Sequence, residues 1–159
     1  MLPASRDPLN DAEHREREVC PRGEPVYPAG LFSPDSVSAV APLYYTKSER
    51  GYQGQYLFGA TITLRPLPGA NAQELEWMLD CHAARSQLHW RGEPVVPNDP
   101  YWVPGHVVRI SVAFEEGVTQ VKIEGKDFAT AKEILVRARA FIGEPSPDNE
   151  GTADSGIRL

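Results

Sequence analysis

Three segments of the chain alternate apolar and polar residues, and this pattern constrains the fold more than any other feature. The alternation runs through "FGATITL" (58–64), "VVRISVAF" (107–114) and "TQVKIE" (119–124). A period of two residues places every second side chain on the same side of a β-strand, so each strand should have one buried and one solvated face. We therefore expect a sheet that is covered on one side.

The stretches beside these strands predict two hairpins. "VSAVAPLYYT" (37–46) is rich in strand formers, but Pro42 lacks a backbone donor, so we expect an edge strand there. "KSERGYQG" (47–54) offers a turn into the strand at 58–64. "EEGV" (115–118) offers the turn between the other two strands.

Two further segments predict helices. Asn71, followed three residues later by Glu74, is typical of a capping box, and we expect a helix from there to about Leu88. Asp127 can cap a second helix, which Gly143 would end. The expected fold class is α+β: a two-layer α/β sandwich with a mainly antiparallel, three- to four-stranded sheet and both helices on one face. This is a variant of the ferredoxin-like fold in which the edge strand replaces the missing last strand.

The two ends of the chain lack such patterns. Residues 1–35 hold six of the 15 prolines and a mixed-charge run with no sustained apolar face, so we expect a flexible N-terminal arm. We expect the tail, 144–159, to be disordered for the same reason. One sandwich domain at 36–143 lies between them.

The net charge of −6 argues against two classes of partner. Binding to nucleic acid or to anionic lipid requires clustered basic residues, so we expect neither. No stretch approaches the roughly 20 apolar residues of a membrane span, and the N-terminus lacks the apolar core of a signal peptide.

One candidate site lies on the first predicted helix, in "WMLDCHAARSQLHW" (77–90). Met78, Cys81 and His82 fall on its sheet-facing side, and a thioether, a thiolate and an imidazole suit copper or zinc. Met and Cys also fill ordinary helix–sheet interfaces, so the alternative of plain core residues stays open. Cys20 could pair with Cys81 if the arm folds back, and such a disulfide would point to an oxidising compartment.

A second candidate is the proline-rich loop that follows, "HWRGEPVVPNDPYWVPGH" (89–106). Its aromatic residues suit a contact surface, because large rings dominate many interfaces. The alternative is that the rings fold down and cover the sheet or the first helix. The candidate binding residues are Arg85, Trp90, Arg91, Tyr101, Trp102 and His106.

Parts of the chain resemble a set of small bacterial proteins of unassigned activity, many of them exported or lipid-anchored. The resemblance rests on "LDCHAAR" (79–85), "DPYWVPG" (99–105) and "ILVRARAF" (134–141) and covers about residues 56–143. It implies a location in the bacterial periplasm or envelope, provided that a leader has been removed; otherwise the cytoplasm is expected. Cys20 follows "REREV" and so lacks a lipidation context.

These observations predict a function without catalysis. The sequence has no paired-cysteine metal motif, Gly-rich phosphate loop or Ser-containing elbow, so we expect no catalytic residues. We expect a non-enzymatic binding or accessory module that contacts a protein or a small ligand through the loop 89–106. The alternative is a bacterial envelope protein that handles copper or zinc through Met78, Cys81 and His82. No other cofactor is expected.

Overall fold

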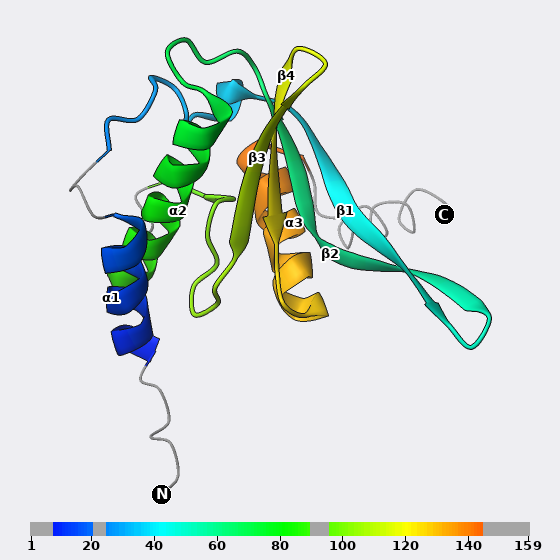
Figure 1. Ribbon diagram of the computed structural model, residues 1–159. Helices are drawn as coiled ribbons and strands as arrows, with labels where there is room; N and C mark the ends of the chain where they lie inside the picture. Colours follow the sequence, from blue (N-terminus) through cyan, green and yellow to red (C-terminus); the bar gives the residue numbers. More distant parts are fainter. Residues whose placement is uncertain (1–7, 21–24, 90–95, 145–159) are drawn as a thin grey trace, which may run out of the picture.

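The computed structural model describes residues 8–20, 25–89 and 96–144 (Figure 1). The elements are the helix α1 (Pro8–Val19), a short 3₁₀ turn (Pro34–Ser36), the strands β1 (Val37–Glu49) and β2 (Tyr52–Leu64), the helix α2 (Ala72–His89), the strands β3 (Arg109–Glu115) and β4 (Val118–Glu124), and the helix α3 (Phe128–Phe141).

The four strands form one antiparallel sheet in the order β1-β2-β4-β3. Helix α3 packs on β2 behind the sheet, and α2 packs beside β3 (Figure 1). The predicted two-layer α+β arrangement is confirmed, and β1 occupies the edge position expected for it. Pro42 lies in this edge strand, which pairs with a neighbour on one side only, the position in a sheet where proline is tolerated.

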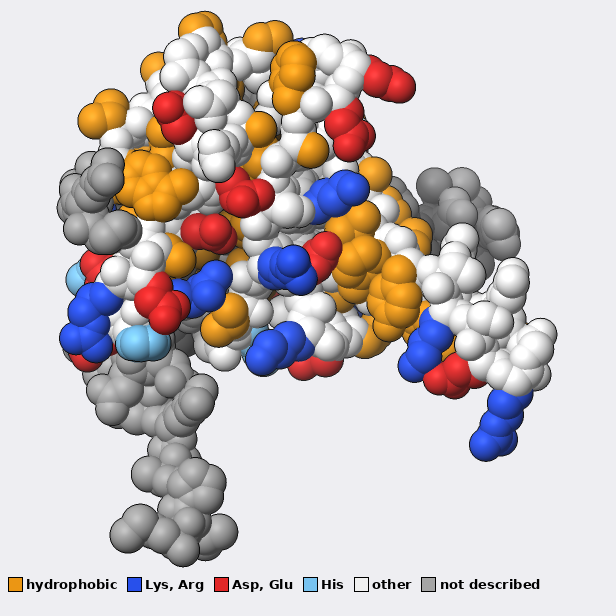
Figure 2. All heavy atoms as spheres, in the orientation of Figure 1, with side chains coloured by type: hydrophobic (Ala, Val, Ile, Leu, Met, Phe, Trp, Pro, Cys, Tyr) orange, Lys and Arg blue, Asp and Glu red, His pale blue; other side chains and the backbone are white. Residues whose placement is uncertain are grey.

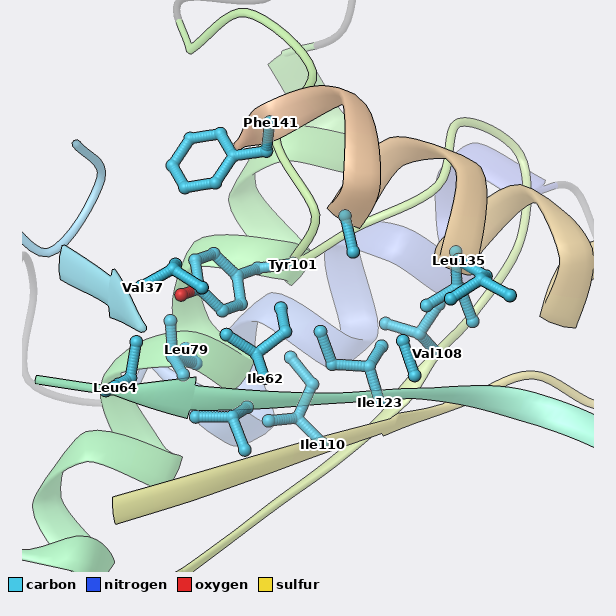
Figure 3. Packing of buried hydrophobic residues seen from close by; sticks show 14 of the residues in the cluster. Val37, Ile62, Leu64, Leu79, Tyr101, Val108, Ile110, Ile123, Leu135 and Phe141 are labelled. Atoms are coloured by element: carbon cyan, nitrogen blue, oxygen red, sulfur yellow. The ribbon is translucent and has the colours of Figure 1, made fainter. Parts of the chain in front are cut away.

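The core follows from the alternation of the strands. Ala60, Ile62 and Leu64 are buried on the helix side of β2, whereas Thr61 and Thr63 on the other side are partly exposed. Burying one such aliphatic side chain contributes roughly 1.5–3 kcal/mol. Figure 3 shows strand, helix and loop side chains meeting in one cluster. The helices contribute Leu75, Leu79, Ile134, Leu135, Ala138 and Phe141 to it.

The opposite face of the sheet carries polar side chains. Cross-strand pairing places Thr61 beside Lys122, and Lys122 beside Ser111. Figure 2 shows charged side chains of both signs on this side of the molecule, and hydrophobic side chains where the β1–β2 hairpin leaves the body. A solvated face of this kind fits the one-sided burial of the strands.

Both predicted helix starts are confirmed by cap geometry. The Asn71 side-chain oxygen accepts the backbone N–H of Glu74 at 2.8 Å, and the Asp127 carboxylate accepts that of Thr130 at 2.7 Å. Each cap satisfies a donor that the first helical turn leaves unpaired. Gly143 follows α3 with φ of +80°, as expected of the residue that ends a helix.

The N-terminal region differs from the expected flexible arm. Residues 8–19 form α1, which packs against α2, and Cys20 forms a disulfide with Cys81. Leu31 is also buried, so the core recruits residues that precede the predicted domain boundary at 36. The covalent bond ties the C-terminal end of α1 to α2.

Residues 1–7, and the predicted disordered tail from 145 onward, lie outside the described residues. Within the described part of the chain, no helix has the length and apolar composition needed to cross a bilayer.

Candidate functional site

The predicted metal ligands all lie on α2, and Cys81 is joined to the end of α1. Met78 and Cys81 are buried, and the Cys81 sulfur is bonded to Cys20. A disulfide sulfur offers no thiolate to a metal. Among the described residues, no three His, Cys, Asp or Glu side chains are grouped so that they could hold an ion. A site of Met78, Cys81 and His82 therefore stays a prediction for the reduced chain.

His82 has its own partners at the edge of the core. Its Nε2 lies 2.5 Å from a carboxylate oxygen of Asp99, which is buried. The ring of Phe32 lies against the imidazole at 4.3 Å between centroids, and Tyr27 approaches it edge-on. His82 thus joins α2 to the 25–36 segment and to the loop before β3.

The aromatic loop folds down onto the helices. Tyr101 and Trp102 are buried, and the Arg137 guanidinium of α3 lies 5.6 Å from the centre of the Trp102 ring. Burial, and secondarily the Asp99 carboxylate, raise the pKa of the Tyr101 phenol, which therefore stays neutral. These two rings present little surface to a partner.

Side-chain contacts from α2 hold the same loop in place. Gln87 donates from its amide nitrogen to the carbonyl oxygens of Val103 and His106, and it accepts the backbone N–H of Gly105 at 3.0 Å. His106 is exposed, whereas Arg85 lies 3.5 Å from Glu16 of α1 in a half-buried pair.

Trp90 and Arg91 lie outside the described residues. Of the four candidates that the structure describes, Tyr101 and Trp102 are buried, Arg85 is half-buried and His106 is exposed, so these four do not form one exposed surface. Binding by this loop stays a prediction, and the burial of both rings does not favour it.

A different surface gathers exposed aromatic rings. β4 pairs with β2 from Gly59 to Leu64, whereas β1 follows β2 back to Tyr52. The outer part of this hairpin therefore extends beyond the body of the sheet (Figure 1). Its tyrosines lie on a two-stranded ribbon rather than over a core.

Two tyrosines face each other across the hairpin. Tyr45 pairs with Tyr56 in the register, and their rings stack with centroids 5.6 Å apart and planes 28° apart. Phe58 stands edge-on to Tyr45 at 5.1 Å. A bulge in β2 at Phe58 interrupts the alternation. Tyr45 lies three residues after Pro42 on β1, so Tyr45 and its partner Tyr56 lie on the other face of the sheet from Ala60, the partner of Pro42. We call Tyr45, Tyr56 and Phe58 the aromatic plate.

The segment that leads into α3 forms the second wall, beside the part of β2 that does not pair with β4. The Gly125 N–H donates to the Phe58 carbonyl at 2.8 Å and fixes the segment before α3 against β2. Phe128, the first residue of α3, is 65% exposed. Between the plate and this wall lies an open groove of about 380 Å³, lined also by Gln55, Leu57, Lys126 and Asp127. We call it the aromatic groove.

The groove is nearly neutral and has hydrogen-bond donors around it. Lys126 and Asp127 are its two charged lining residues, and the Asp127 carboxylate is engaged in capping α3. Hydrogen bonds from the Thr130 backbone N–H and side chain lower the pKa of Asp127, so it remains ionised. The Tyr45 and Tyr56 hydroxyls, the Gln55 amide and the Lys126 ammonium are groups that can donate.

Sequence reasoning missed this groove. A usable signal was present in the sequence. Tyr45 precedes Arg50 by as many residues as Tyr56 follows Gly51, and Arg50 and Gly51 lie in the predicted turn. A hairpin centred there pairs the two tyrosines. Nothing in the local sequence, however, places Phe128 opposite them.

Comparisons with protein-family models, with curated proteins and with solved structures find no match to this chain. The resemblance to small bacterial proteins stays a prediction. The function proposed next rests on the chemistry of the described residues.

Proposed function

We propose that this protein is a non-enzymatic binding module that contacts a partner protein through the aromatic groove. The observation that carries the proposal is the gathering of Tyr45, Tyr56 and Phe128, each more than 40% exposed, around one groove. Exposed aromatic rings in a cluster are unusual on a monomer and are enriched at protein contacts. This proposal moves the contact surface from the loop 89–106 to the hairpin.

The chemistry of the groove supports binding rather than catalysis. General acid–base catalysis needs a titratable group free to exchange a proton with the substrate. Of the two charged residues that line the groove, Asp127 is engaged with the Thr130 N–H. Lys126 lies on the surface, away from the burial that tunes a catalytic lysine.

We propose further that the chain works in an oxidising compartment such as the bacterial envelope. The Cys20–Cys81 disulfide supports this location, because structural disulfides persist mainly outside the reducing cytosol. The same bond supports the fold, since it holds α1 against α2.

The test is a selection from a random peptide display library against the disulfide-bonded protein. We expect enriched peptides that bind wild type and lose about tenfold in affinity on Phe128→Ala, because truncating one central interface ring typically has such an effect. Phe114→Ala is the matched control: Phe114 is 67% exposed and lies at the end of β3, on the other hairpin. Enrichment of no peptide, or equal loss with both variants, would count against the groove as a contact site.

A further inference from the structure

We infer that the partner segment in the aromatic groove is a proline-rich, basic stretch of another protein, bound as a polyproline II helix. This inference rests on the proposed function and names the chemistry of the occupant. Three observations support it: the arrangement of the rings in the groove, the donors at its rim, and the net charge of the chain.

The ring arrangement suits pyrrolidine rings. Tyr45 and Tyr56 stack with planes 28° apart and present a broad surface, while Phe58 stands at 77° to Tyr45. A polyproline II helix places a side chain on the same side every third residue, roughly every 9 Å. Proline rings can rest on the plate and pack against Phe128 without the entropy loss that ordering a flexible peptide requires.

The hydrogen-bonding groups point to the same ligand. A polyproline II segment has no internal hydrogen bonds, so its carbonyl oxygens remain free to accept, and each proline lacks an N–H. The groove offers donors in the Gln55 amide, the tyrosine hydroxyls and Lys126. Its carboxylate, Asp127, already accepts from Thr130. A donor-bearing groove and an acceptor-bearing ligand are complementary.

The groove itself is nearly neutral, but the net charge of the whole chain favours a basic partner. The chain carries a net charge of −6, and Asp127 puts an ionised carboxylate at the groove itself. A segment with arginines beside the prolines would be steered toward this surface, while an acidic one would be repelled. Lys126 is the one cation among the described lining residues and can donate to a ligand carbonyl.

The experiment uses a fluorescent peptide, Arg-Pro-Pro-Leu-Pro-Pro-Arg, titrated with the full, disulfide-bonded chain and followed by anisotropy. Two comparison peptides replace the prolines with alanines or the arginines with glutamates. We expect the first peptide to bind at least about tenfold more tightly than either comparison peptide. Phe128→Ala and Tyr56→Ala should each weaken this binding by about tenfold, and Phe114→Ala should leave it unchanged.

The outcomes separate the two proposals. Equal binding of the alanine peptide would overturn the polyproline ligand. If the display selection instead yields proline-free peptides whose binding depends on Phe128, the proposed polyproline ligand is wrong, whereas the proposed binding function is supported. If neither assay detects binding, both proposals fail. A dimer in sedimentation that Phe128→Ala dissociates would also overturn the ligand, because a second copy would then fill the groove.

Discussion

The imidazole Nε2 of His82 lies 2.5 Å from a side-chain oxygen of Asp99, whose side chain is 2% exposed. The other carboxylate oxygen accepts the Tyr101 N–H at 2.9 Å, and the Asp99 carbonyl accepts Nε of Arg137 at 2.9 Å. Asp99 therefore joins α2, the loop before β3 and α3. Together with Gln87, which binds the backbone at Val103, Gly105 and His106, Asp99 holds the proline-rich loop against the helices.

Replacing Asp99 with alanine should destabilise the fold strongly. The substitution leaves the Tyr101 N–H and the His82 imidazole in or near the core without their acceptor, and breaking such a buried pair typically costs about 3–5 kcal/mol. Urea unfolding followed by circular dichroism measures the loss. Asp35→Ala, at an exposed position in the 3₁₀ turn, is the control. A loss below about 0.5 kcal/mol for Asp99→Ala would contradict the role assigned to it.

Local signals in the sequence were sufficient for the framework of the fold. The alternation in β2, β3 and β4 determines which face of each strand is buried. The side chains of Asn71 and Asp127 each cap a helix by accepting the backbone N–H of the residue three positions later. Such rules act between neighbours in the chain, so they can be applied before the fold is known. Helix α1 has no strong signal of this kind.

The site depends on contacts between distant residues, and these were not predictable. Whether Tyr101 and Trp102 project or pack depends on His82, Gln87 and Arg137, which lie 14 to 36 residues away in the chain. The pairing of Cys20 with Cys81 spans 61 residues. The sequence left both outcomes open, because an amphipathic ring or a cysteine is compatible with either environment.

Breaking the disulfide should lower stability by about 4 kcal/mol. The chain-entropy model gives this value for a closed loop of 61 residues. Cys20→Ser and reduction of the wild type should produce similar losses in urea unfolding, since both release α1 from α2. Mass spectrometry under non-reducing conditions, with thiol labelling as the control, checks that the bond is present. Two labelled thiols in the untreated, folded protein would contradict the pairing.

The same bond should govern metal uptake. We expect no stoichiometric binding of copper(I) or zinc by the disulfide-bonded chain, because Cys81 has no thiolate and His82 Nε2 is engaged with Asp99. Native mass spectrometry of the oxidised and the reduced protein compares the two states directly. One equivalent bound by the oxidised chain and lost with Met78→Leu would contradict this expectation and favour a site built around Met78.

The interface between α1 and α2 should be pH-sensitive. Burial raises the pKa of Asp80 from 3.8 to about 6; Arg15 of α1 opposes the shift and Glu76 adds to it. The folded state therefore binds the proton more tightly than the unfolded state does. The contribution of protonated Asp80 to the free energy of unfolding is therefore fully present below pH 3.8 and is lost as the pH rises through about 6.

Asp80→Asn removes that titration, so its stability relative to wild type should increase as the pH rises from 4 to 7. Unfolding curves of both proteins at several pH values give the difference. Glu13→Gln, an exposed change on α1, should show no such trend. A parallel pH dependence for wild type and Asp80→Asn would mean that Asp80 is not the titrating group.

Replacing Gly59 should disrupt the fold, because Gly59 is the residue of β2 at which pairing with β4 ends and beyond which the β1–β2 hairpin extends alone. A Cβ atom on Gly59 would lie 1.7 Å from the carbonyl oxygen of Ile123, a backbone atom that cannot move without breaking the β2–β4 ladder. We expect Gly59→Ala to prevent folding or to separate the hairpin from β4. Gly51→Ala is the matched control: Gly51 has φ of +78° and open space around it, so alanine there should cost only about 1 kcal/mol of backbone strain. Amide chemical shifts of β2 and β4 report the outcome, and native-like shifts in Gly59→Ala would show that the two strands do not approach as closely as described.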